Sequence, residues 1–157
     1  YKPSDRLSFD LDFTLRETDR WMVYLAGNTI GGYDADHWQP KLSAEFFLTA
    51  RQQLRFSLQW VGIKARAQDL YSVVDDELQR TTDGLNTTAY DFTISRLTSQ
   101  LRYRWEIAPL SDLFVVYTRG SNIPNRQRDA FGDLFHDALT DPIIDLFVVK
   151  LRYRFGN

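Results

Sequence analysis

Alternating apolar and polar side chains dominate this chain. From Leu7 to Arg16, five apolar residues at odd positions alternate with five polar or charged ones. The segment 145–155 repeats the pattern, with large apolar residues at odd positions and Lys150, Arg152 and Arg154 between them. A period of two is typical of a β-strand whose two faces meet different surroundings.

The same alternation predicts seven strands, at about 7–16, 21–30, 37–49, 53–65, 92–107, 113–119 and 145–155. Short turns at 17–20, 50–52 and 108–112 follow the first, third and fifth strands, and a loop at 31–36 follows the second. Two long loops cover 66–91 and 120–142. In the second of these loops, segment 129–139 carries Phe131, Leu134, Phe135 and Ala138 at helical spacing, which predicts a short amphipathic helix that folds over or into a pore, or caps its rim.

One face of these strands is apolar throughout, whereas the other face carries charges that a protein core does not accept. A transmembrane β-barrel accommodates both, with lipid on one face and a polar lumen on the other. The predicted fold is therefore all-β, an antiparallel meander barrel of about seven or eight strands in a bacterial outer membrane. Residues 1–157 form a single domain, with the short turns and the C-terminus on the periplasmic side. A soluble β-sandwich or lipocalin-like barrel is the alternative.

Two sets of residues follow from this interpretation. The charged residues expected to line the lumen are Asp10, Asp12, Glu45, Arg55, Arg96, Arg102, Arg104, Arg119, Lys150, Arg152 and Arg154. Arg119 belongs to this set if Phe114, Val116 and Thr118 face outward. These charges either select ions and anionic solutes or pair across strands and fill a solvated interior. The aromatic residues expected at the membrane interfaces are Trp21, Trp105, Tyr153 and Phe155 near the short turns, and Trp38 and Trp60 at the other rim.

The odd strand count has a consequence for closure. With seven strands, the first and last run in the same direction and do not pair antiparallel, although bacterial barrels are normally even and antiparallel. We therefore expect the C-terminal part of a larger barrel, with the remaining strands supplied by a longer precursor or by another chain. If the strand count is wrong by one, the chain closes instead as a small eight-stranded barrel filled by side chains.

Composition excludes several kinds of function. Lys and Arg number 19 against 21 acidic residues, so no basic footprint for nucleic acid is present. Cys is absent, and no apolar run reaches the length of a transmembrane helix. His37 and His136 are the only histidines, and neither belongs to a recognisable triad or metal-binding pattern. The sequence thus predicts no enzyme, no metal and no cofactor, and the acidic loops are interpreted as solvated.

Three segments carry a resemblance. Asp91–Arg96, Gln100–Asn122 and Phe147–Phe155 resemble the C-terminal barrel of a family of large bacterial outer-membrane proteins of unknown function. Those proteins have an N-terminal β-sandwich similar to family 9 carbohydrate-binding modules, and they have no established catalytic residues. The resemblance implies contact with outer-membrane lipid. The aromatic end of the last strand is similar to the signal read by the outer-membrane insertion machinery, although here Gly156 and Asn157 follow Phe155.

The expected function is that of an outer-membrane barrel that forms or lines a passage for solutes or polymers such as carbohydrate, without chemistry. Two alternatives remain at this point: a small closed barrel with a structural or adhesive role at the cell surface, and a soluble β-barrel that binds an apolar ligand.

Overall fold

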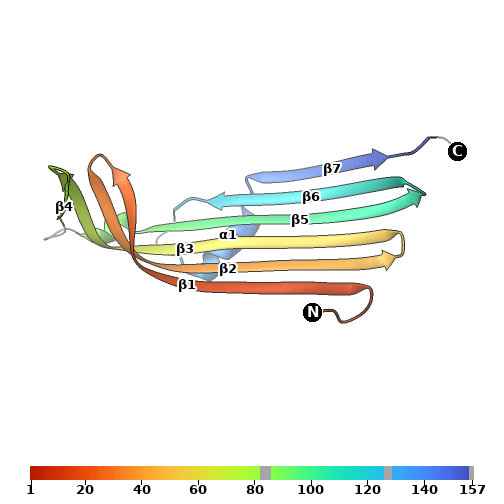
Figure 1. The fold of residues 1–157 in the computed structure, drawn as a ribbon, viewed down its shortest axis with the longest axis horizontal. Helices are drawn as coiled ribbons and strands as arrows, with labels where there is room; N and C mark the ends of the chain where they lie inside the picture. Colours follow the sequence, from red (N-terminus) through yellow and green to blue (C-terminus); the bar gives the residue numbers. More distant parts are fainter. Residues whose placement is uncertain (82–85, 126–128, 156–157) are drawn as a thin grey trace.

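A computed structural model describes residues 1–81, 86–125 and 129–155 as one large antiparallel sheet with a single α-helix (Figure 1). The strands are β1 (Leu7–Ala26), β2 (Thr29–Thr49), β3 (Gln52–Val74), β4 (Glu77–Arg80), β5 (Phe92–Ala108), β6 (Ser111–Ile123) and β7 (Ile144–Arg152). The order across the sheet is β1-β2-β3-β5-β6-β7, and β4 pairs only with β3. The sheet is not closed, so β1 and β7 form its two edges. The all-β antiparallel fold is thus confirmed, whereas a closed barrel is not what this chain shows.

The first three predicted strands are in fact two long ones. The predicted turn at 17–20 lies inside β1, and the predicted loop at 31–36 lies inside β2. The true turn is Gly27–Asn28, where Gly27 has a φ of 56° that suits glycine. The register of β1 against β2 shifts between Thr18 and Trp21, and Arg20 has a φ of 54° there. Such a bulge changes the parity of the side chains, which is why the alternation looks broken in the sequence.

The predicted loop at 66–91 is also shorter than expected. β3 continues to Val74 and forms a hairpin with β4 through Asp75 and Asp76, which have φ values of 51° and 62°. Positive φ at both central residues is the geometry of the tight hairpin turn that matches the twist of its strands. A 3₁₀ turn, η1 (Thr87–Tyr90), then leads into β5. Residues 82–85 of the predicted loop lie outside the described residues.

The corrected strand count changes the directions of the edge strands. Each neighbouring pair along the path from β1 to β7 is antiparallel, so β1 and β7 run in opposite directions (Figure 1). The expectation that the first and last strands run in the same direction was wrong because it split β1 and β2 into three strands. Two-residue turns at Ala50–Arg51 and Pro109–Leu110 join strands at one end of the sheet, as predicted. We call this the turn end.

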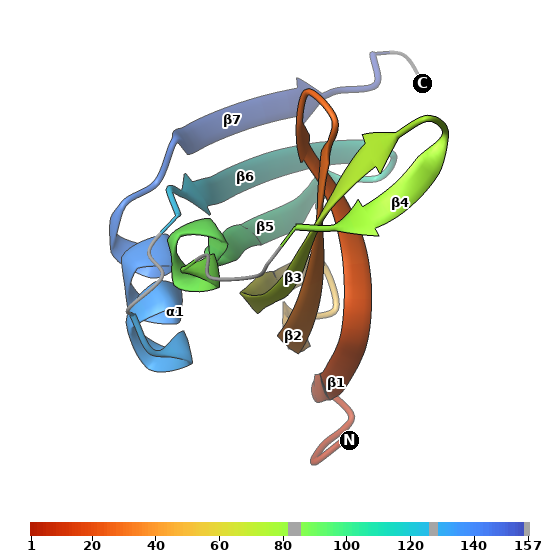
Figure 2. The same cartoon turned by 90° about the vertical axis from the view of Figure 1, so that its left-hand side faces the viewer.

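The opposite end carries the helix and is called the helix end. Helix α1 (Phe131–Thr140) confirms the helical spacing found in the sequence, and it lies beside the sheet near β3, β5 and β6 (Figure 2). Leu134 and Ala138 are fully buried between α1 and the sheet. The predicted loop around α1 includes residues 126–128, which lie outside the described residues. No helix among the described residues is both long and apolar enough to cross a membrane.

Two small cores lie towards the helix end, on opposite faces of the sheet. One joins Trp60, Leu97 and Ile123 to the buried side of α1. The other gathers Tyr33 with Ala35, Ala65 and Ala67, and it is flanked by partly buried apolar residues such as Phe92. Among the described residues, neither core extends to the turn end, where both faces of the sheet are bare.

Candidate functional site

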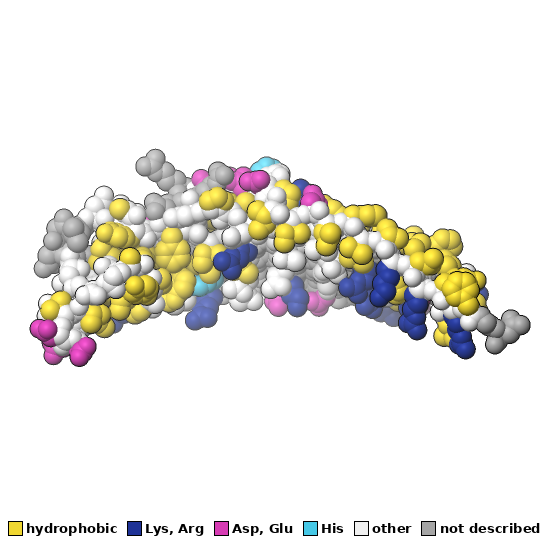
Figure 3. Space-filling model, turned by 90° about the horizontal axis from the view of Figure 1, so that it is seen from above, with side chains coloured by type: hydrophobic (Ala, Val, Ile, Leu, Met, Phe, Trp, Pro, Cys, Tyr) yellow, Lys and Arg dark blue, Asp and Glu magenta, His cyan; other side chains and the backbone are white. Residues whose placement is uncertain are grey.

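The register of the sheet defines two faces of different chemistry. One row of directly paired residues runs Phe9, Ala44, Phe56, Leu101, Tyr117, Phe147 across the six long strands. We call the side to which this row belongs the apolar face, and the opposite side the charged face. Figure 3, which looks onto the β7 edge, shows hydrophobic side chains along the upper, convex border and Lys and Arg side chains along the lower one. The period-two pattern of the sequence therefore sorts the side chains as predicted.

The apolar face is largely uncovered towards the turn end. Leu11 is 67% exposed on β1, and Phe147 is 65% exposed on β7. The large hydrophobic side chains exposed on this face are Phe9, Leu11, Phe13, Leu15, Trp38, Phe46, Leu101, Trp105, Phe147, Val149 and Leu151. Each such side chain is worth about 1.5–3 kcal/mol when it leaves water. Contiguous apolar surfaces of this extent mark a contact with lipid or with another protein.

The charged face has a basic row at its centre. Arg55 on β3 lies directly opposite Arg102 on β5, and Arg104 follows on the same strand. Two like charges in opposite positions repel each other, so each needs a partner. Arg55 forms an ion pair with Glu45, with 2.8 Å between Nη2 and Oε1, and Gln53 also donates to that carboxylate. Arg102 donates to the Gln100 side chain over 3.0 Å, and no acidic side chain of the described residues forms an ion pair with it.

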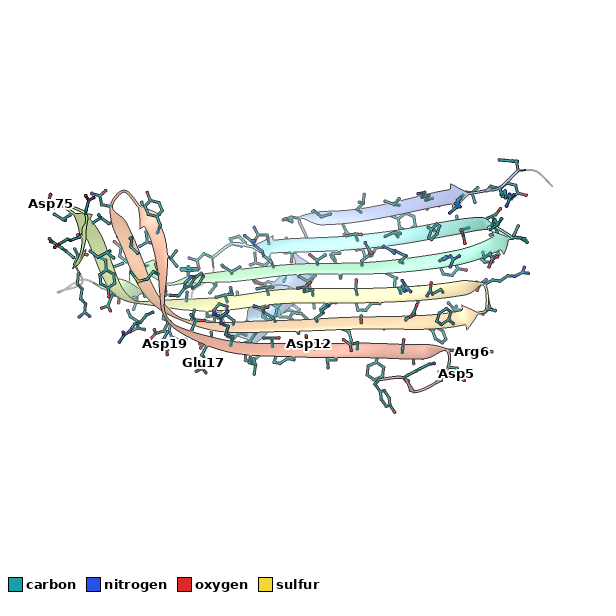
Figure 4. All side chains as sticks on the ribbon, viewed as in Figure 1. Asp5, Arg6, Asp12, Glu17, Asp19 and Asp75 are labelled. Atoms are coloured by element: carbon teal, nitrogen blue, oxygen red, sulfur yellow. The ribbon has the colours of Figure 1, made fainter. Side chains whose placement is uncertain are left out.

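Charge changes sign across this face. Asp10 and Asp12 lie on the edge strand β1, where Figure 4 labels Asp12, whereas Lys150 and Arg152 lie on the opposite edge strand β7. No ion pair engages any of these four residues among the described parts of the chain. Acid predominates on β1 and base on β5 and β7, but the separation is not strict, because Lys41 on β2 lies directly opposite Asp12 and Asp112 on β6 pairs with Arg104.

Hollows adjoin the basic row. One of about 700 Å³ is lined on the charged face by Ser43, Ser57 and Gln100 together with the charged residues Asp10, Glu45, Arg55 and Arg102. A second, of about 270 Å³, is lined by Gln53, Arg55, Arg102, Arg104 and Phe114. Both hollows share Arg55 and Arg102. Hydroxyl, amide and guanidinium groups therefore converge where the sheet is bare, which suits a hydrated polar or anionic solute.

Three other residues of the predicted lumen set make contacts within the sheet. Arg104 forms an ion pair with Asp112, which is 8% exposed, at 3.0 Å. Arg96 donates to the side chain of Asn122 over 3.1 Å on the charged face. Arg154 follows β7, and its backbone N–H donates to Ser111.

Arg119 is misplaced by the sequence prediction. The register pairs it with Ser99 and Asp145, which lie on the apolar face, and Tyr117 shares that face. Phe114, Val116 and Thr118 instead face the charged side, so this part of the sheet is apolar on both faces. Arg119 approaches Asp145 at 3.9 Å, and its Nε is buried without a hydrogen-bond partner. A strand that is apolar at nearly every position gives no period from which its facing can be read.

The predicted interface aromatics separate in the structure. Trp105 is 40% exposed on the apolar face at the turn end, and Tyr153 and Phe155 follow β7 there with their rings in edge contact at 4.8 Å. Trp38 is also 40% exposed on the apolar face, towards the helix end. Trp21 is at the wrong end: it pairs with Tyr33, on the side of the second core. The error in the end arose because the predicted turn at 17–20 lies inside β1, and the bulge after Thr18 changes the facing of the ring.

Trp60 is the second exception, because it is buried rather than exposed. Its side chain is only 2% exposed beneath α1, and its Nε1 donates to Ser95 Oγ over 3.0 Å. Ser95 in turn donates to the backbone oxygen of Leu134, over 2.9 Å. The indole ring lies across Gly62, where an added Cβ would stand 2.5 Å from Trp60 Cζ2. A missing side chain at position 62 thus makes room for the ring that anchors the helix.

The second core shows one titration effect. Tyr33 is fully buried, and its hydroxyl donates to the backbone oxygen of Tyr90 over 3.2 Å. Burial raises the pKa of Tyr33 above its usual value of 10.0, and the nearby carboxylate of Asp91 adds to the effect. This arrangement ties η1 to the β1–β2 extension and has the character of a structural contact.

The two histidines and the acidic hairpin tip lie in separate parts of the described chain. No group of three or more His, Cys, Asp or Glu side chains is arranged to hold a metal ion there. His37 contacts the hydroxyl of Thr18 at 3.2 Å, and His136 belongs to α1. The acidic tip at Asp75 and Asp76 stands at the end of the β3–β4 hairpin, where Figure 4 labels Asp75.

Comparison with known proteins gives one match. The family model described as "Domain of unknown function (DUF5916)" matches residues 1–155. No curated protein and no solved structure matches the chain. Because the family model spans nearly the whole sequence, the chain belongs to the DUF5916 family, a domain of unknown function.

Proposed function

We propose that this chain is part of an outer-membrane β-barrel and forms a wall that lines a passage for solutes or polymers such as carbohydrate, and that it performs no chemistry. The observation that carries the proposal is the apolar face at the turn end, which continues over all six long strands and has large exposed side chains on β1, β2, β5 and β7. Water does not favour such a surface, whereas the hydrocarbon region of a membrane does.

The dimensions of the bare region support the proposal. On β1 it runs from Leu7 to Leu15, and β7 is nine residues long. A tilted transmembrane strand needs about 9–11 residues, so the bare segments have the appropriate length. Trp105, Tyr153 and Phe155 at the turn end and Trp38 towards the helix end would then lie near the two interfaces. The turn end and the C-terminus would be periplasmic.

The charged face would be the lumen wall. Its basic row and the hollow lined by serine, glutamine and charged residues favour hydrated and anionic solutes. The free edges β1 and β7 run in opposite directions, so an even number of further strands would complete an antiparallel barrel. These strands would come from the same precursor or from another chain, and the outer-membrane insertion machinery would assemble them.

Single-channel recording tests the proposal. The protein as the cell makes it, reconstituted in a planar bilayer, is expected to conduct and to prefer anions. Combining Arg102→Glu with Lys150→Glu replaces two lumen cations and is expected to lower the anion preference several-fold. Arg119→Gln is the matched control, because it removes a cation from the apolar face and is expected to leave selectivity unchanged. Absence of conductance, or an equal effect of both changes, contradicts a charge-lined passage.

A further inference from the structure

An aromatic pocket lies on the apolar face where α1 meets the sheet. Its volume is about 270 Å³, and it is lined by Phe13, Trp38, Pro40, Trp60, Phe131 and Phe135 together with Gly132. Phe131 stacks on Trp38 with ring centres 4.6 Å apart, and Phe135 meets Trp60 edge-on at 5.2 Å. Three strands and a helix far from them in the sequence therefore build a single apolar wall.

The lining of the pocket is almost entirely apolar. The indole N–H of Trp60, which belongs to the lining, is already bound to Ser95. The pocket is open at the surface, and an open hollow with an apolar lining favours the hydrocarbon part of a ligand over water. A lining with so few hydrogen-bonding groups argues against a sugar or an ion in the same place.

The position of the pocket and its open side indicate which kind of hydrocarbon ligand it binds. Phe13 belongs both to the pocket and to the bare apolar face, so the pocket is continuous with the surface that the proposed function assigns to lipid. Gly132 on α1 adds an open place in the lining, because a Cβ built there meets no atom within 4 Å. A flexible chain that already lies on the apolar face can therefore enter without displacing protein atoms.

We propose that this pocket binds one acyl chain of a membrane lipid, held between the Trp38–Phe131 stack and the Trp60 ring. The inference rests on the proposed function, since the lipid is taken from the surrounding membrane. It adds a specific lipid site to a face that otherwise contacts lipid without selection. An acyl chain in this place also packs against α1 and stabilises its contact with the sheet.

Fluorescence quenching by phosphatidylcholine with brominated acyl chains tests the proposal in reconstituted vesicles. One reporter keeps Trp60 alone, through Trp21→Phe, Trp38→Phe and Trp105→Phe. A second reporter keeps Trp105 alone, which faces lipid at the turn end. Brominated lipid is expected to quench both, Trp105 because it is exposed on the apolar face and Trp60 because it lines the pocket. Gly132→Leu adds a large side chain at the lining of the pocket and is expected to remove most of the quenching of Trp60, whereas Gly132→Ala is expected to retain it.

The outcomes separate the two proposals. Quenching of Trp105 without quenching of Trp60 overturns the acyl-chain site and leaves the membrane proposal standing. Equal quenching of Trp60 with and without Gly132→Leu also overturns it. If neither reporter is quenched, the membrane proposal fails and the lipid site fails with it. In the unmodified tryptophan background, a loss of quenching on Gly132→Leu supports the site even if a reporter does not fold.

Discussion

Gly62→Ala is expected to destabilise the protein by displacing Trp60. The added Cβ would lie 2.5 Å from Cζ2 and 2.9 Å from Cζ3 of the indole ring. Carbon atoms in good contact stand about 3.5–4.0 Å apart, so the ring must move by about 1 Å or more. Overpacking of this kind costs about 1–3 kcal/mol. Movement of the ring also weakens the bond from Trp60 to Ser95, a contribution of about 0.5–1.5 kcal/mol.

Replacing glycine also lowers the conformational entropy of the unfolded chain. This effect stabilises the folded protein by about 0.4–1 kcal/mol and offsets part of the loss. The net loss is therefore about 1–3 kcal/mol. Urea unfolding of the detergent-solubilised protein, followed by tryptophan fluorescence, measures it as a midpoint lower by about 1 M for a slope near 2 kcal/mol per M. Gly132→Ala is the matched control, since its Cβ enters open space and improves the helix by up to about 1 kcal/mol. A Gly62→Ala protein as stable as the wild type would refute the reasoning.

Three further predictions concern single contacts, each measured by urea unfolding. Ser95→Ala leaves the Trp60 N–H without a partner and removes the side-chain hydrogen bond to the Leu134 oxygen, and it is expected to cost about 1–3 kcal/mol, whereas a loss below about 0.5 kcal/mol contradicts the bridge. Asp145→Ala removes the partner of Arg119 and the acceptor of the Tyr117 hydroxyl on the apolar face, and it is expected to cost about 1 kcal/mol. Changing both Arg119 and Asp145 to Leu is expected to restore the stability, and a double variant less stable than the single one argues against this account. Because the raised pKa of Tyr33 favours its neutral form in the fold, its contribution is complete below pH 10 and falls as the pH rises above that value, where the unfolded chain ionises first. Tyr33→Phe is expected to reduce this loss of stability at alkaline pH. An unchanged dependence of stability on pH contradicts the role given to Tyr33.

The strands that alternate strictly could be predicted from the sequence. The pattern located β5 and β7 closely, placed the turns at Ala50–Arg51 and Pro109–Leu110, and found α1 from four apolar residues at helical spacing. Each of these elements has one periodicity and turn residues at its ends, so local pattern and tertiary structure agree.

The errors have a common physical origin in the long strands. β1 and β2 contain polar segments that look like turns, yet these segments pair with each other, and the segment of β2 also pairs with β3. The bulge after Thr18 then reverses the facing of Trp21, and a single extra residue of this kind leaves no clear mark in the sequence. Because this error added a strand, it also reversed the predicted direction of β1 relative to β7.

The candidate site could be predicted in part. The charged residues of β1, β3, β5 and β7 face the side expected of them, whereas Arg119 on β6 does not, since its neighbours are apolar in both directions. The aromatic pocket escaped prediction because it depends on α1 docking against the apolar face, a contact between residues almost a hundred positions apart. Gly62 next to Trp60 was the available signal, because a glycine on the same face makes room for a large ring.

Flotation of the protein with lipid vesicles tests the central claim most directly. After reconstitution, vesicles are washed at alkaline pH and floated through a density gradient, which separates inserted protein from protein that is adsorbed or soluble. The bare apolar face at the turn end predicts that the protein floats with the lipid and needs detergent for release. Recovery from the aqueous fraction without detergent would contradict the assignment of that face to the membrane.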